Sequence, residues 1–217
     1  TPTYLVSAIF RRNSIFFRPW GGAWRRALAT YDTLFVQNEE SKHLLESIGY
    51  HNATIAGYTR FDRVATIAKQ PTKIPIVERF RGNRRLFVAG STWQRDEEIL
   101  LELINSNPEI CFVIAPHEID QRRIDHLISE VKGGAVRYTE SCDRSDFSHV
   151  QVLILDTIGL LASLYGYATW AYVGGGFGAG IHNTLEAATF GLAIAFGPRY
   201  RKFKEACDMI DIGRASC

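Results

Sequence analysis

The sequence lacks the patterns that mark several common classes of protein. Its four cysteines show no C-x-x-C spacing, which argues against a zinc site and against a disulfide framework. No apolar run approaches the roughly 20 residues that a membrane-spanning helix needs, and no signal peptide is visible. The net charge of +2 is too small to indicate a basic binding face, so we expect no nucleic-acid partner.

The residues that are present have the composition of a folded α/β protein. Hydrophobic residues make up 46% and charged residues 22% of the 217 positions. Such a chain is long enough for one domain plus part of another. Because it opens on a strand-like segment and closes just after a helical one, we expect a soluble fragment of a longer protein.

Three regions follow one another along the chain. Residues 1–66 are expected to be the end of one α/β domain. Residues 67–83 carry Pro71, Pro75 and Gly82 among mixed charges, and are the predicted linker. Residues 84–217 alternate helical segments with short apolar runs, which predicts a parallel, doubly wound sheet. Its predicted strands are 86–89, 111–115, 136–138, 152–155, 171–173 and 193–196.

The loops that follow these strands are the most informative positions, because ligands bind outside the carboxyl ends of parallel strands. We expect the five loops after residues 89, 115, 155, 173 and 196 to converge on one rim. The loop after residue 173 contains five glycines between Gly174 and Gly180. Such a loop can adopt positive φ and bring its N–H groups close to phosphate. A dinucleotide fingerprint also fits loosely. It would require an acidic residue about 20 positions later, where Gly197 and Pro198 stand instead.

Several side chains at these strand ends have two interpretations. Asn183 and Glu186 form a capping-box-like pattern, but Glu186 would also suit a ribose diol. Ser91 and Thr92 could cap a helix or donate hydroxyl groups to phosphate. The segment 156–159 is a helix start or a close approach to a ligand. His117 and its neighbour Glu118 could be surface residues, and no further side chain has the spacing of a metal ligand.

The first 31 residues contain five arginines and no acidic residue, interleaved with aromatic side chains. Arginine pairs well with phosphate, and aromatic rings suit a membrane interface. This segment is therefore either a platform for an anionic lipid or an aromatic core with solvated arginines. The residues concerned are Arg11, Arg12, Arg18, Arg25, Arg26, Phe10, Phe16, Phe17, Trp20 and Trp24.

Motifs along nearly the whole chain resemble the 3-deoxy-D-manno-octulosonic acid (Kdo) transferases of lipopolysaccharide synthesis. In order they are FVQNEESKHLLESIG, TRFDRV, GSTW, APHEID, LDTIGLLASLYG, YVGGGFGAGIHNTLEAA and FGPRYRKFKEA. The Gly-rich HN-x-LE segment and the D-T-I-G segment are the most specific of these.

The resemblance implies a GT-B architecture with two Rossmann-like domains. It implies inverting, metal-independent transfer of Kdo from CMP-Kdo to a lipid A precursor, with no cofactor. The full-length enzyme is then expected at the cytoplasmic face of the bacterial inner membrane, in peripheral contact with it. The C-terminal domain would bind CMP-Kdo and the N-terminal domain the acceptor.

The resemblance also implies which residues contact the donor. These are Ser91, Thr92, Pro116, His117, Ile158, Gly159, Gly175, Gly176, His182, Asn183 and Glu186. Arg60 would lie near the cleft, with Arg11 and Arg12 as further candidates on the acceptor side. The sequence departs from the family pattern at Leu160, where many relatives carry Glu, and at His117, which no Arg precedes.

The family's catalytic carboxylate and membrane anchor have no counterpart in the sequence, so both are expected outside it. The alternative functions are a GT-B transferase or epimerase that uses a UDP-sugar, and a non-catalytic nucleotide-binding module.

Overall fold

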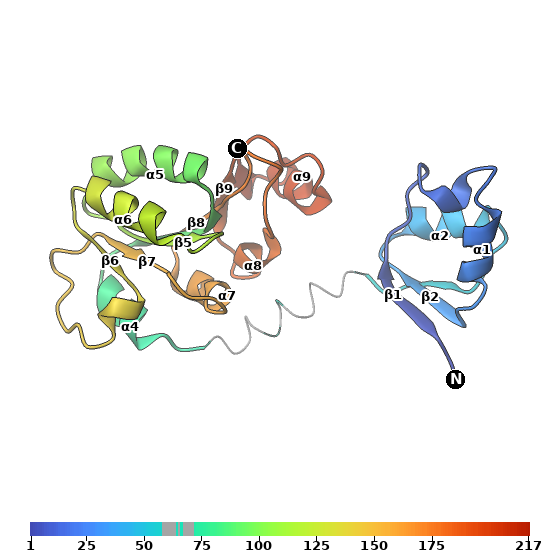
Figure 1. Ribbon diagram of the computed structural model, residues 1–217, viewed down its shortest axis with the longest axis horizontal. Coiled ribbons are helices and arrows are strands. Elements are labelled where there is room, and N and C mark those ends of the chain that lie inside the picture. Colours follow the sequence, from blue (N-terminus) through green and yellow to red (C-terminus); the bar gives the residue numbers. More distant parts are fainter. Residues whose placement is uncertain (58–63, 65, 67–71) are drawn as a thin grey trace. The chain divides into compact units, whose positions relative to one another are not determined.

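The computed structural model describes residues 1–57, 64, 66 and 72–217. The chain divides into two compact units, Thr1–Arg63 and Val64–Cys217 (Figure 1). Both are built on parallel sheets with helical connections, which confirms the predicted α/β fold class. No helix among the described residues is both long enough and apolar enough to cross a membrane.

The smaller unit is a three-stranded parallel sheet with helices between its strands. Its strands, in spatial order, are β1 (Tyr4–Ala8), β2 (Thr33–Val36) and β3 (Ala53–Ile55). The connections hold η1 (Ile15–Phe17), α1 (Gly22–Leu28) and α2 (Glu39–Glu46). Helix α2 begins where it does because the Asn38 side chain accepts a hydrogen bond from the Ser41 N–H. Leu34, Val36 and Leu45 are fully buried in its core.

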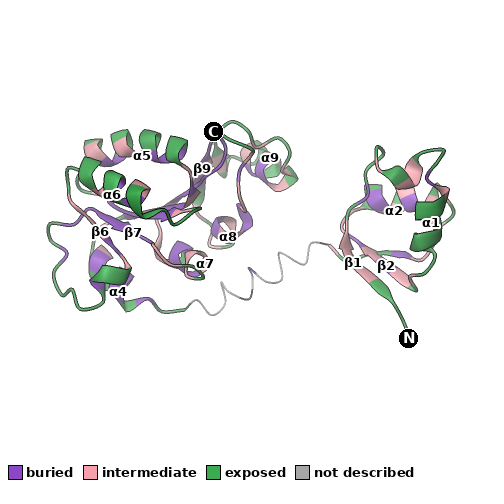
Figure 2. Cartoon of the chain, viewed as in Figure 1, coloured by how far each residue is buried: buried purple, intermediate pink, exposed green. Residues whose placement is uncertain are grey.

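The larger unit is built on a seven-stranded, wholly parallel sheet with the spatial order β10-β9-β8-β4-β5-β7-β6. Its four central strands, β8, β4, β5 and β7, are buried through most of their length (Figure 2). Strand β4 is central and pairs with both β5 and β8, so the loops after these three strands emerge side by side. The strands are β4 (Leu86–Thr92), β5 (Cys111–Pro116), β6 (Ala135–Arg137), β7 (Val152–Ile154), β8 (Trp170–Val173), β9 (Ala193–Phe196) and β10 (Ala215–Ser216).

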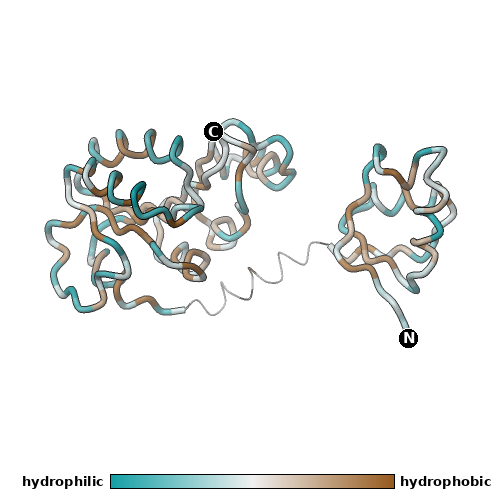
Figure 3. The backbone as a smooth tube through the Cα atoms, in the orientation of Figure 1, coloured by the Kyte–Doolittle hydropathy of each residue, from teal (hydrophilic) through white to brown (hydrophobic). Residues whose placement is uncertain are grey.

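Helices cover the two faces of this sheet in separate groups. Leu100 and Ile104 of α5 (Gln94–Ser106), with Ile124 and Leu127 of α6 (Gln121–Glu130), pack on one face. The second group packs on the opposite face (Figures 1 and 3). It comprises α4 (Pro75–Arg81), α7 (Leu161–Leu164), α8 (Leu185–Ala188) and α9 (Lys204–Asp211). The short 3₁₀ turns are η2 (Thr139–Ser141) and η3 (Tyr165–Tyr167). Neighbouring residues of a strand enter opposite cores, as Val88 and Ala89 do.

Helix α4 lies inside the range 67–83 that the sequence analysis assigned to a linker. Residues 67–71 of that range lie outside the described residues. The helix itself buries Ile76, Val77 and Phe80 in the core of the larger unit, so residues 75–81 are part of that unit. Pro75 does not prevent the helix because it occupies the first turn, where no intrahelical N–H donor is required.

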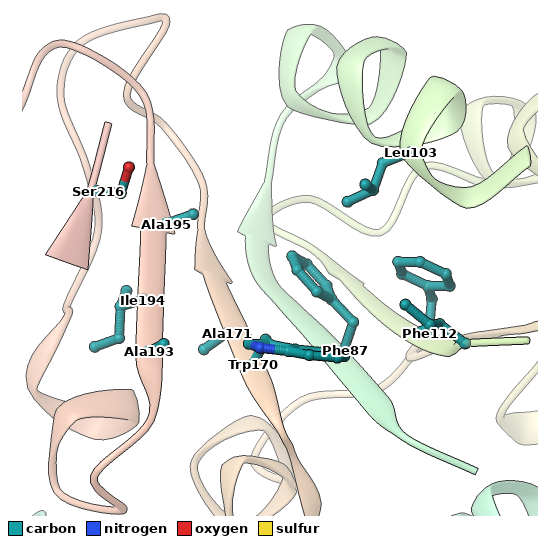
Figure 4. A pocket seen from close by; sticks show the side chains of 10 residues that line it. Phe87, Leu103, Phe112, Trp170, Ala171, Ala193, Ile194, Ala195 and Ser216 are labelled. Carbon is teal, nitrogen blue, oxygen red and sulfur yellow. The ribbon is translucent and has the colours of Figure 1, made fainter. Parts of the chain in front are cut away.

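A hollow of about 340 Å³ lies on the face of the sheet that α5 covers only in part (Figure 4). Phe87, Phe112 and Trp170 form much of its floor, and Leu103 of α5 forms a wall. Its lining is almost entirely apolar. The hollow lies on the sheet face and not at the carboxyl ends of the strands, so we do not assign the donor to it.

Candidate functional site

The candidate site is the edge of the larger sheet where the loops after β4, β5, β8 and β9 meet. Contacts between these loops bring together residues that are far apart in the sequence. The ring of His182, after β8, stacks on that of His117, after β5, with centroids 4.2 Å apart. The Gly176 carbonyl accepts a hydrogen bond from the N–H of Arg199, after β9. The prediction that these loops share one rim therefore holds for these four strands.

Glycine is required at several positions of the loop after β8 because backbone passes against backbone there. A Cβ on Gly174 would lie 2.3 Å from the Ser91 carbonyl oxygen, and one on Gly176 would lie 2.5 Å from the Cα of Gly197. Gly175 has φ +92°, a conformation that favours glycine. The packing of this loop therefore explains the run of glycines without reference to a ligand.

The same loop nevertheless presents unused donors. Across the described residues, the N–H groups of Gly176, Phe177 and Ala179 donate to no protein acceptor. Those of Gly178 and Gly180 both donate to the Gly175 carbonyl, and that of His182 donates to the Gly174 carbonyl. Unpaired main-chain N–H groups in a glycine-rich turn suit an anion such as phosphate.

Trp93, His117 and His182 form a stack of three rings. Trp93 stacks on His117 with centroids 4.6 Å apart, and its indole Nε1–H donates to Nε2 of His182 over 3.0 Å. An Nε2 that accepts a hydrogen bond belongs to a neutral imidazole with its proton on Nδ1. In agreement, burial and then the neighbouring His117 hold the pKa of His182 below its ordinary value, although Asp96 opposes this.

Asp96 is a functional candidate that the sequence analysis missed. Its carboxylate is 1% exposed and lies beneath the glycine-rich loop. It accepts hydrogen bonds from the N–H of Trp93 at 2.8 Å, the hydroxyl of Tyr172 at 2.6 Å and the N–H of Gly175 at 3.0 Å. Burial and this carboxylate together raise the pKa of Tyr172 far above its ordinary range, so the phenol stays protonated and donates.

The two hydroxyl residues that end β4 differ in their surroundings. Thr92 is fully buried and donates its hydroxyl to Oε1 of Glu97 at 2.8 Å, so it faces the α5 interior. Burial raises the pKa of Glu97, and the Thr92 hydrogen bond and the Arg123 charge act against that rise. Ser91 is half-buried with φ +53°, an uncommon conformation for a residue other than glycine. Ser91 is therefore better placed than Thr92 to meet a ligand.

Asn183 and Glu186 contact each other at the start of α8. The Asn183 amide donates to Oε1 of Glu186 at 3.1 Å, and its oxygen accepts from the N–H of Leu185 at 3.1 Å. The residue before the helix is Thr184, whose side chain caps nothing, so the predicted capping box centred on Asn183 is wrong. Asn183 instead pairs with the first helical N–H from one residue further out, and Glu186 orients its amide. Burial and the Glu186 charge raise the pKa of Tyr165, whose hydroxyl lies against Gly90 at the end of β4.

Other predicted donor residues lie on the neighbouring loops. Pro116 ends β5 and is half-buried, and the N–H of the next residue, His117, donates to the Thr92 carbonyl at 2.9 Å. Ile158 is 86% exposed, and Gly159 has φ +91°, which favours glycine before α7. Their loop is held by Asp156, which accepts from both the N–H and the hydroxyl of Thr139.

On the smaller unit, Arg11 and Arg12 are exposed in the turn between β1 and η1. Trp20 and Trp24 are 72% and 53% exposed. Arg60 lies outside the described residues. The exposed tryptophans show that the aromatic residues of this unit do not all belong to its core.

A pocket of about 370 Å³ adjoins the ring stack. Trp93, Asp96 and His182 line one part of it, and Phe177 with residues 178–180 lines the rest. Arg95 stands at its edge. Its volume is in the range of small-molecule sites, and it places aromatic surface beside the unused N–H groups of the loop. The described residues include no group of three or more His, Cys, Asp or Glu that could hold a metal ion.

Solved structures with the same fold include two nucleotide-sugar proteins. The C-terminal CMP-Kdo binding domain of WaaA from Acinetobacter baumannii matches 71% of this chain and 79% of its own, with a TM-score of 0.51 and 23% identity. A UDP-N-acetylglucosamine 2-epimerase matches 99% of this chain and 52% of its own, with a TM-score of 0.62 and 11% identity. These similarities show the fold, including its GT-B type.

Sequence comparison is more specific. No protein-family model matches the chain. A 3-deoxy-D-manno-octulosonic acid transferase from Bordetella pertussis is 28% identical over 228 residues, covering 99% of this chain and 52% of the relative. The enzyme of that name from Rickettsia prowazekii (strain Madrid E) is 28% identical over 81% of this chain and 38% of the relative. The chain thus spans about half the length of these relatives, or less. These similarities confirm the resemblance to 3-deoxy-D-manno-octulosonic acid transferases that the sequence motifs indicated.

Proposed function

We propose that the larger unit binds the donor CMP-Kdo, and that the whole protein transfers Kdo to a lipid A precursor with inversion. The observation that carries this proposal is that the connection between β8 and β9 contains both unused N–H groups, at Gly176 and Phe177, and a carboxylate, at Glu186. The former suit a phosphate and the latter a ribose diol. The names of the sequence relatives supply the sugar, Kdo, and the CMP-Kdo binding domain among the similar structures supplies the nucleotide.

In this proposal each part of the site has a distinct role. The loop N–H groups and Ser91 hold the donor phosphate. Glu186, kept in place by the Asn183 amide, accepts the ribose hydroxyls. The flat stack of His117 and His182 provides a surface beside the pocket for the rest of the donor. Thr92 does not contact the donor in this proposal, because its hydroxyl is bonded to Glu97 of α5 and supports the loop from the protein interior.

The reaction is an inverting displacement. An acceptor hydroxyl attacks the anomeric carbon of Kdo, the bond from that carbon to the phosphate oxygen breaks, and CMP leaves. Negative charge grows on the departing phosphate, where preorganised N–H groups stabilise it. The base that removes the hydroxyl proton is assigned to no residue of this sequence, so we expect these 217 residues to bind CMP without transferring Kdo.

The smaller unit is proposed to serve the acceptor. Arg11 and Arg12 are exposed and suit the phosphates of a lipid A precursor. The exposed rings of Trp20 and Trp24 suit peripheral contact with the inner membrane. Arg60 is proposed for the same function from its motif alone.

Calorimetric titration of the chain with CMP, UMP and UDP tests the donor assignment. We expect CMP to bind more tightly than UMP and UDP. A preference for UDP would show instead that the rim serves a UDP-sugar, and equal binding of all three would contradict recognition of cytidine. The variant Asp125→Ala is a suitable control, because Asp125 of α6 pairs with Arg137 of β6, at the edge of the sheet. It should bind CMP like the native chain.

A further inference from the structure

We propose that Asp96 is a positioning residue that fixes the glycine-rich loop and the ring stack in the arrangement that receives the donor. The claim about loop structure stands on the contacts of Asp96 alone. The claim about donor affinity rests on the proposed function. Asp96 is buried and does not itself need to touch the donor.

The contacts of Asp96 exceed what a helix start requires. Asp96 is the third residue of α5, and a carboxylate there commonly accepts from the residue that precedes the helix, here the N–H of Trp93. Capping explains that bond alone. The bonds from Tyr172 on β8 and from Gly175 in the loop span 76 and 79 positions of sequence and contribute nothing to capping.

Two structural paths lead from this carboxylate to the rim. The first is direct, because Oδ2 fixes Gly175, which immediately precedes the unused N–H groups of Gly176 and Phe177. The second runs through Trp93: the same Oδ2 holds its N–H, and its indole Nε1–H donates to His182. One carboxylate thus sets both ends of the segment between Gly175 and His182.

Loss of this carboxylate would destabilise the present conformation of the glycine-rich loop. Without Asp96, the N–H of Gly175 would be buried and unpaired, because its bond to Oδ2 is made in a solvent-excluded position. A buried donor without a partner is strongly unfavourable, so the loop would move to find another one. The unused N–H groups of Gly176 and Phe177, which directly follow Gly175, would then be displaced.

The first test needs no variant and no ligand. Hydrogen exchange of individual amides in the native chain, followed by NMR, should show the Gly175 amide strongly protected and the Phe177 amide freely exchanging. Comparable, fast exchange of both amides would overturn the proposal. This result does not depend on which donor the protein uses.

The second test compares variants. Asp96→Ala should speed exchange at Gly175 by more than about tenfold and weaken CMP binding by about tenfold or more, the effect of one lost hydrogen bond to a charged group. Asp125→Ala, which removes an aspartate that accepts a hydrogen bond from Arg137 of β6, should change neither quantity. Asp96→Asn can still offer an oxygen to Trp93 and Gly175 and an amide to Tyr172, so it should recover most of the CMP affinity.

The outcomes separate the two proposals. If Asp96→Ala exchanges at Gly175 like the native chain, the positioning role is wrong, whatever the affinity for CMP. If Asp96→Ala lowers the melting temperature but leaves CMP affinity unchanged, Asp96 only caps α5. If the native chain binds no CMP but its loop responds to Asp96→Ala as expected, the donor assignment fails and the positioning role stands.

Discussion

Replacement of Glu186 by alanine distinguishes donor binding from helix capping. Glu186 accepts from the Asn183 amide, whereas the first N–H of α8, that of Leu185, donates to the Asn183 oxygen. Glu186→Ala therefore leaves the bond at the helix start in place. We expect the free energy of unfolding to fall by about 1 kcal/mol or less, the net value of one hydrogen bond.

The effect on the ligand should be larger. Hydrogen bonds from ribose hydroxyls to a carboxylate contribute about 1.5–3 kcal/mol, which corresponds to a roughly 10- to 150-fold weaker affinity for CMP. Calorimetry measures the affinity, and urea unfolding measures the stability. Glu205→Ala is the matched control, since Glu205 stands in the first turn of α9 as Glu186 does in α8. An affinity within twofold of the native value, together with a stability loss like that of Glu205→Ala, would refute the ribose assignment.

Three further predictions concern the loop, the ring stack and the core. Gly176→Ala places a Cβ 2.5 Å from the Cα of Gly197 and should abolish measurable CMP binding. Gly178→Ala meets only ordinary contacts and should bind CMP like the native chain. Native-like binding by both variants would contradict the role of the loop. Folding lowers the pKa of His182, so below about pH 6.5 the unfolded chain binds more protons than the folded chain. The free energy of unfolding therefore decreases as the pH is lowered. Urea unfolding at pH 7.5 and 5.5 should show that the free energy of unfolding depends less on pH in His182→Gln than in the native chain. An unchanged pH dependence would contradict the lowered pKa of His182. Phe80→Ala should cost about 3–5 kcal/mol of unfolding free energy, and a loss below about 1 kcal/mol would contradict the burial of α4.

Local sequence patterns predicted the strands of the larger sheet well. The strand at Ala193–Phe196 has the predicted bounds, because a short apolar run between helices is the pattern of a strand covered on both faces. Strand β10 was missed because Ala215 and Ser216 form no apolar run. Helix α4 was missed because Pro75 was treated as a helix breaker, although proline is well suited to the first turn.

The site was less predictable because its contacts are distant in sequence. Glycines and histidines at strand ends indicated the rim correctly. However, the bond from Gly175 to Asp96 and that from Trp93 to His182 span 79 and 89 positions, and no local pattern marks them. Burial also cannot be read from residue type: Thr92 carries the hydroxyl expected of a phosphate ligand, yet the fold buries it against Glu97.

A crystal structure of the chain with bound CMP tests the central claim most directly. We predict the phosphate within hydrogen-bond distance of the N–H groups of Gly176 and Phe177, and the ribose hydroxyls on Glu186. A nucleotide bound elsewhere, such as in the apolar hollow over Phe87 and Trp170, would contradict the account.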